Sequence, residues 1–138
     1  MTATRTPVDV LLVSLGTTFG LRTADDQLTA LLRAEGITVE VARPVPPREV
    51  RTLALTDLVQ ARACRAAARE ALERVEPRAL LYASTTAAMF GPRPGAIRFD
   101  ALAQRTRPGH DGPWQRALER RRLRAAPLLL PWAEGSLE

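Results

Sequence analysis

The chain has 138 residues and a formal net charge of +5, and all 20 of its basic residues are arginine. This length suits one domain with its own core, and 46% hydrophobic against 25% charged residues excludes wholesale disorder. One cysteine excludes a disulfide framework, and no apolar run approaches the ~20 residues that span a bilayer. The first residues do not form a secretory signal. We therefore expect a cytoplasmic protein.

The first elements form a strand, a glycine-rich turn, a helix and a second strand. Residues 8–15 are an almost continuous apolar run, which is typical of a strand buried on both faces of a parallel sheet. Glycines at positions 16 and 20 mark the turn that follows. Residues 37–42 alternate and are rich in β-branched side chains, which predicts the second strand. The pattern is that of a right-handed βαβ unit.

The helix between these strands is expected to begin at a capping box, in which Thr23 precedes Asp26 by three residues, and to end at Gly36. Its leucines are predicted to face the core, and its polar side chains to turn away from it. The core-facing set is Leu28, Leu31 and Leu32, and the outward set is Asp25, Thr29 and Arg33.

A long helix is predicted from a cap at Thr56 and Asp57 to about Glu76, with Pro77 stopping it. Residues 51–55, just before it, are ambiguous between a short strand and a lead-in to the helix. The apolar stripe of the helix is narrow and rich in alanine, which favours close packing against a sheet. Cys64 lies on this stripe, so we interpret it as a packing residue.

The remaining segments alternate between strand and helix. Strands are expected at 79–83, 96–99 and 128–130, and an arginine-rich helix at 114–124. This alternation predicts an α/β fold: a Rossmann-like, open and mainly parallel sheet with helices on both faces. Ligands of such sheets bind beyond the carboxyl ends of the strands. Those ends are Gly16 to Gly20, Ser84 to Thr86, Asp100 and Glu134 to Ser136.

Two of these ends carry candidate binding groups. The turn from Gly16 to Gly20 matches neither the dinucleotide fingerprint nor the phosphate-binding loop of nucleotide hydrolases. Its glycines would let the backbone approach a ligand, and the helix after it favours an anion, but a plain turn between strand and helix is the favoured interpretation. The hydroxyls of Ser84 to Thr86 could bind a sugar or phosphate, but a helix cap is the favoured interpretation.

The candidate for acid–base chemistry is His110, the only histidine, which lies beside Asp111 in a Gly/Pro-rich loop. A solvated loop histidine is the simpler interpretation. The chain has too few ligands for a zinc site, so no metal is predicted. The arginines between Arg116 and Arg124 spread around their helix, and aromatic residues are only 4% of the chain, which disfavours nucleic-acid binding.

Several motifs in order resemble one known family. Residues 91–100 (GPRPGAIRFD) and 107–116 (RPGHDGPWQR) precede 128–132 (LLLPW) and 134–136 (EGS). Together with residues 10–20 (VLLVSLGTTFG), they resemble the N-terminal domain of bacterial group 1 (family 4-like) glycosyltransferases. The resemblance covers nearly the whole chain, and it is carried by the order and spacing of short motifs.

The resemblance implies the GT-B fold, in which two Rossmann-like domains meet at an active-site cleft. This chain would be the acceptor-side half, without the C-terminal nucleotide-sugar domain, and the fragment alone would be inactive. Family members transfer a sugar from a nucleotide-sugar, generally with retention and without a metal or other cofactor. Many relatives carry a histidine where this chain has Ser84 to Thr86, so no catalytic residue is firmly assigned. The candidate catalytic residues are His110 and Asp100, and the expected substrate-binding residues are Gly16, Thr17, Thr18, Phe19, Gly20, Ser84, Thr85, Thr86, Arg98, Arg107, Glu134 and Ser136.

The partners expected from the resemblance are a nucleotide-sugar, a sugar or glycoconjugate acceptor and the absent C-terminal domain. Self-association through the exposed interdomain face is expected. Peripheral contact with the inner membrane face is left open. The alternative hypothesis is a non-catalytic α/β module that binds a small anion or a protein partner.

Overall fold

The computed structural model describes residues 4–16, 19–45, 53–99 and 113–131. In chain order the elements are β1 (Thr6–Val13), α1 (Phe19–Ala34), β2 (Val39–Ala42), α2 (Leu53–Arg74), β3 (Val75–Tyr82), α3 (Thr85–Ala88), β4 (Ala96–Phe99), α5 (Pro113–Ala125) and β5 (Leu129–Pro131). Within the described segments, no helix combines the length and apolar character needed to cross a bilayer.

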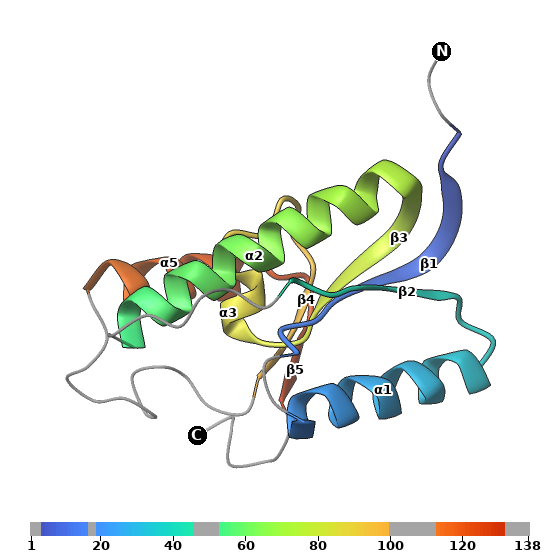
Figure 1. The fold of residues 1–138 in the computed structure, drawn as a ribbon, viewed down its shortest axis with the longest axis horizontal. Helices are drawn as coiled ribbons and strands as arrows, with labels where there is room; N and C mark the ends of the chain where they lie inside the picture. The colour runs from blue at the N-terminus through green and yellow to red at the C-terminus, as the bar shows by residue number, and fades with distance from the viewer. Residues whose placement is uncertain (1–3, 17–18, 46–52, 100–112, 132–138) are drawn as a thin grey trace.

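The five strands form one sheet in the order β2-β1-β3-β4-β5, and every pairing is parallel. Helix α1 covers one face of this sheet, and α2, α3 and α5 lie on the other (Figure 1). The predicted fold class is therefore confirmed: this is an open, Rossmann-like α/β sheet with helices on both faces.

The strand order places a topological switch point between β1 and β3. After β1 the chain crosses by α1 to β2 on one side, and after β2 it crosses by α2 to β3 on the other side of β1. Because all strands are parallel, their carboxyl ends lie at one edge of the sheet. Connections that leave in opposite directions open a crevice at that edge, which is where doubly wound sheets bind ligands.

Alternating side chains of the central strands fill two core layers. On one face Leu11 and Tyr82 pack with the alanine stripe of α2 and with α3, and Cys64 is buried among them. On the other face Leu12 and Leu81 pack against Leu28 and Leu32 of α1, among others. Small side chains let α2 lie close to the sheet, so the predicted alanine stripe and the packing role of Cys64 are confirmed.

Helix α1 differs from its prediction at its start and on its core face. It begins at Phe19, so the predicted capping box lies inside the helix. Asp25 and Thr29 are buried, with 1% and 6% of their surface exposed, whereas Leu31 is 60% exposed. The predicted orientation of these three side chains was wrong. Buried partners of Asp25, described below, account for its inward position.

The predicted end of α1 is confirmed as a Schellman motif. Gly36 has a φ of +81°, a left-handed conformation that glycine adopts without steric cost. Its N–H donates to the Arg33 carbonyl, and the Ile37 N–H donates to the Leu32 carbonyl, each at 3.0 Å. These bonds satisfy two carbonyls at the end of the helix and turn the chain toward β2.

Helix α2 begins earlier than predicted and also ends earlier. It starts at Leu53, so Thr56 and Asp57 lie within it rather than at its cap, and it stops at Arg74. Pro77 therefore does not end the helix but lies in β3. At this position β3 pairs with β1 alone, because its pairing with β4 is limited to Leu81 and Tyr82, so a residue without an N–H is tolerated.

Candidate functional site

The candidate site lies at the carboxyl edge of β1 and β3. Beyond the last residues of β1, the Ser14 N–H donates to the Ala42 carbonyl, and the Ala83 N–H donates to the Val13 carbonyl, each at 2.9 Å. These bonds extend the parallel ladder to the edge. They hold the start of the glycine turn between the ends of β2 and β3.

A buried polar network lies beneath this edge. The Ser14 hydroxyl donates to one carboxylate oxygen of Asp25, and the Arg98 guanidinium donates to the other. The Arg98 Nε also donates to the Ala83 carbonyl at 3.4 Å. Ser14, Asp25 and Arg98 have 0%, 1% and 9% of their surface exposed. The network joins the end of β1, the second turn of α1 and β4.

The charges of this network stabilise each other. A buried carboxylate or guanidinium without a partner is strongly unfavourable, whereas a hydrogen-bonded pair offsets much of the desolvation cost. Asp25 therefore fixes the side chain of Arg98. Through this contact Arg98 links α1 to β4, which lies beside β3. The network sets the position of the segments at the carboxyl edge of the sheet.

Arg98 was predicted to contact substrate, and that role stays a prediction. The structure places its guanidinium beneath the edge, on Asp25 and the Ala83 carbonyl. In this arrangement Arg98 helps to position the chain where β3 ends, at the site.

The glycine turn presents open backbone and one exposed aromatic ring at the edge. Gly16 has a φ of +59°, and its carbonyl accepts from the Arg22 guanidinium at 3.3 Å. Phe19 is 77% exposed, and a side chain added at Gly20 would meet open space. A ligand can therefore approach the chain closely here. Thr17 and Thr18 lie outside the described residues.

The residues after β3 form a helix cap, as the favoured interpretation predicted. Ser84 is the N-cap of α3, and its hydroxyl accepts from the Ala87 N–H at 3.1 Å. Thr85 and Thr86 follow in the first turn of α3 and are half-buried. After Ser84, they carry the next two hydroxyls along the chain beyond the end of β3.

The structure does not place the other candidate residues. Asp100, Arg107, His110, Glu134 and Ser136 lie outside the described residues, so their catalytic and binding roles stay predictions. Among the described residues, no cluster of histidine, cysteine and carboxylate side chains could hold a metal ion.

Cys64 lies beneath the site and is fully buried. Its Sγ is 3.6 Å from the Ser14 carbonyl oxygen. Burial raises the pKa of the Cys64 thiol to about 12, so the reactive thiolate is scarce at neutral pH. The thiol therefore packs under the end of β1.

Comparison with protein-family models, with curated proteins and with solved structures found no match to this chain.

Sequence reasoning missed the role of Asp25, although a signal was present. Positions 25, 28, 29 and 32 recur at the helical spacing of one face. Leu28 and Leu32 do face the core, so the same spacing places Asp25 on the buried side. Its partner Arg98 is 73 residues away in sequence, and no local pattern links the two.

Proposed function

We propose that this domain is the acceptor-side half of a glycosyltransferase, which transfers a sugar from a nucleotide-sugar to a sugar or glycoconjugate acceptor. The observation that carries the proposal is the edge of the sheet at the β1/β3 switch point. There an open glycine turn and the hydroxyl-bearing start of α3 follow neighbouring parallel strands. The motif resemblance supplies the substrate class.

The described residues at this edge suit a carbohydrate. The exposed Phe19 ring offers a flat apolar surface to the C–H face of a sugar. The Thr85 and Thr86 hydroxyls can each donate and accept hydrogen bonds. In the proposed enzyme these groups hold the acceptor, and a second domain holds the nucleotide.

The proposed transfer retains the anomeric configuration and needs no metal. Positive groups and helix N-termini around the cleft would stabilise the leaving diphosphate. His110 and Asp100 remain the candidates for proton transfer. Alone, the chain is expected to bind acceptor without transferring sugar.

The test measures ligand binding to the 138-residue chain. Saturation-transfer NMR with a panel of sugars and glycoconjugates should detect an acceptor, and nucleotide-sugars alone should bind weakly or not at all. Thr85→Val should weaken acceptor binding by about fivefold through loss of one hydrogen bond. Thr6→Val is the matched control, because Thr6 lies at the start of β1 on the opposite edge of the sheet.

Two results would contradict the proposal. One is equal binding by the Thr85→Val and Thr6→Val variants. The other is the absence of any sugar binding together with tight binding of a nucleotide-sugar. When the chain is joined to a nucleotide-sugar-binding domain of this enzyme class, transfer activity should appear and should fall in the Thr85→Val variant.

The strand order also favours the second candidate, a non-catalytic module that binds a small anion. The order β2-β1-β3-β4-β5 is shared with free-standing α/β domains that bind phosphate-bearing ligands at the β1/β3 switch point. Tight binding of inorganic phosphate that is lost in Gly16→Val, with no sugar binding, would favour this module over the glycosyltransferase half.

A further inference from the structure

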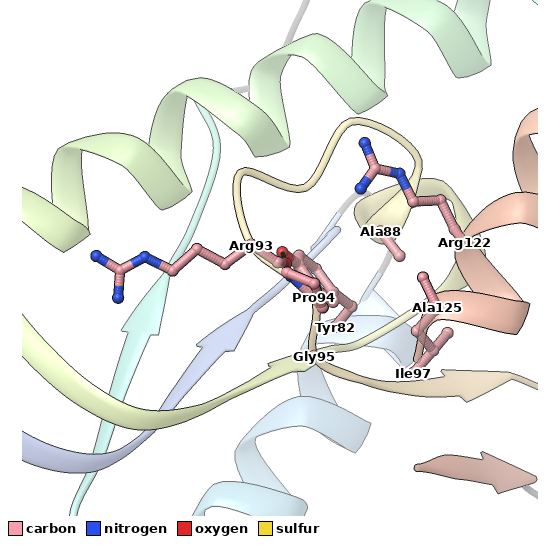
Figure 2. A pocket seen from close by; sticks show the side chains of 8 residues that line it. All are labelled: Tyr82, Ala88, Arg93, Pro94, Gly95, Ile97, Arg122 and Ala125. Atoms are coloured by element: carbon pink, nitrogen blue, oxygen red, sulfur yellow. Dashed lines mark hydrogen bonds between the residues drawn. The ribbon is translucent and has the colours of Figure 1, made fainter. Parts of the chain in front are cut away.

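The groove between the outer surface of α2 and the turn after α3 lies apart from the carboxyl-edge site. It is a shallow, open hollow of about 280 Å³ that is lined by Arg62 and Arg65 of α2 and by Phe90. A second hollow, beside α5, encloses only about 10 Å³, which is room for roughly one water molecule (Figure 2). Of these two hollows, only the first can take a ligand.

The groove is positively charged. Residues 58–69 of α2 include three arginines and no carboxylate. By contrast, Arg74 near the end of the same helix pairs with Glu70 at 3.2 Å. In the described part of the chain, neither Arg62 nor Arg65 pairs with a carboxylate. Two guanidinium groups one turn apart therefore face the groove without a neutralising charge.

Of the two groove arginines, Arg65 is held in place by a hydrogen bond to the turn after α3, and this turn is also bound from α5. Arg65 is half-buried, and its Nη1 donates to the Phe90 carbonyl at 2.8 Å. From the other side the Arg122 Nε donates to the Met89 carbonyl at 3.0 Å. Arg122 reaches toward this turn from α5 (Figure 2). A guanidinium that is already positioned loses little conformational entropy when it binds an anion.

We propose that this groove binds the phosphate of a small phosphate monoester whose flat ring lies against Phe90. Guanidinium forks match the geometry of phosphate oxygens, and a dianion balances both charges. The Phe90 side chain adds an apolar wall, which a bare phosphate ion would not use. The site extends beyond the proposed glycosyl transfer, because none of its residues belongs to the carboxyl edge.

The experiment titrates the 138-residue chain with phenyl phosphate at low salt, by ligand-observed NMR. Inorganic phosphate and phenol serve as the two halves of the probe, and each should bind more weakly than phenyl phosphate. Arg62→Gln should weaken phenyl phosphate binding by about fivefold or more. Phe90→Leu should reduce it to the level of inorganic phosphate while keeping the backbone carbonyl that holds Arg65.

The matched control is Arg69→Gln, one turn further along α2 and outside the groove. Its effect should be clearly smaller than that of Arg62→Gln, because Arg69 does not line the groove and contributes only its more distant charge. Thermal unfolding of each variant verifies that it is folded. Thr85→Val should leave phenyl phosphate binding unchanged, so failure at the carboxyl edge and failure of this groove are told apart.

Four results would overturn the proposal. They are the absence of saturable phenyl phosphate binding, equal losses in the Arg62→Gln and Arg69→Gln variants, loss of binding in Thr85→Val, and binding to phosphatidate vesicles without binding of phenyl phosphate. The second would indicate diffuse attraction to a basic helix. The last would assign the groove to a lipid headgroup.

Discussion

Replacement of Arg98 by methionine should destabilise the domain strongly. Methionine keeps most of the length of the arginine stem but removes the charge that faces Asp25. The Asp25 carboxylate, 1% exposed, would then keep the Ser14 hydroxyl but lose its cationic partner. Removing one partner of a buried ion pair leaves the other charge unpaired and lowers the free energy of unfolding by about 3–5 kcal/mol.

The structure supports the upper part of that range. Arg98 donates to the Asp25 carboxylate and also to the Ala83 carbonyl, so both hydrogen bonds are lost with the charge. A hydrogen bond that involves a charged group contributes about 1.5–3 kcal/mol. Domains have a total stability of about 5–15 kcal/mol, so the loss is a large fraction of it.

Urea unfolding followed by circular dichroism measures the effect. The matched control is Arg78→Met, because Arg78 is 85% exposed and its ion pair with Asp9 spans 3.8 Å. This control should change the free energy of unfolding by no more than about 0.5 kcal/mol. The double variant Asp25→Leu with Arg98→Met removes both charges and should recover at least half of the loss.

The reasoning fails if Arg98→Met costs less than about 1 kcal/mol, the range of an exposed ion pair. It also fails if the double variant is less stable than Arg98→Met alone. Either result would mean that Asp25 and Arg98 do not depend on each other.

Three further predictions concern single positions. Gly95→Ala should lower the free energy of unfolding by about 1–3 kcal/mol, because its Cβ would lie 2.6 Å from a backbone oxygen of β3. Gly20→Ala, which has open space in α1, should raise it by about 0.5–1 kcal/mol. Urea unfolding compares the two variants. Cys64 should resist iodoacetamide in the folded chain and react only in urea, as mass spectrometry would show, since burial raises its pKa to about 12; rapid labelling without urea would contradict this. Hydrogen bonds from Thr38 lower the pKa of Asp9, so its stabilising effect is present above the unfolded pKa and is lost as the pH falls through the folded pKa. Wild type should therefore be more stable than Asp9→Asn at neutral pH, and the two should converge in acid; a gap that persists in acid would refute the assignment.

Two local features of the carboxyl edge could be anticipated from the sequence, but the buried ion pair beneath it could not. The Gly16 turn and the cap at Ser84 are local features, each visible in a few consecutive residues. The contact between Asp25 and Arg98 exists only because α1 and β4 meet across the end of β3. Pattern reading assigned Asp25 to solvent from its charge alone, although the helical spacing pointed inward.

Local sequence determines the elements of this protein and its class of fold. Continuous apolar runs at residues 8–15 and 79–83 can be buried only in a sheet covered on both faces, and the alanine stripe of α2 can pack only against a flat neighbour. The order of the strands, the starts of the two long helices, and the tolerance of Pro77 inside β3 depend on neighbours that are distant in the chain. These features, like the burial of Asp25, become favourable only when folding brings the hydrogen-bond partners together, because burial without those partners is costly.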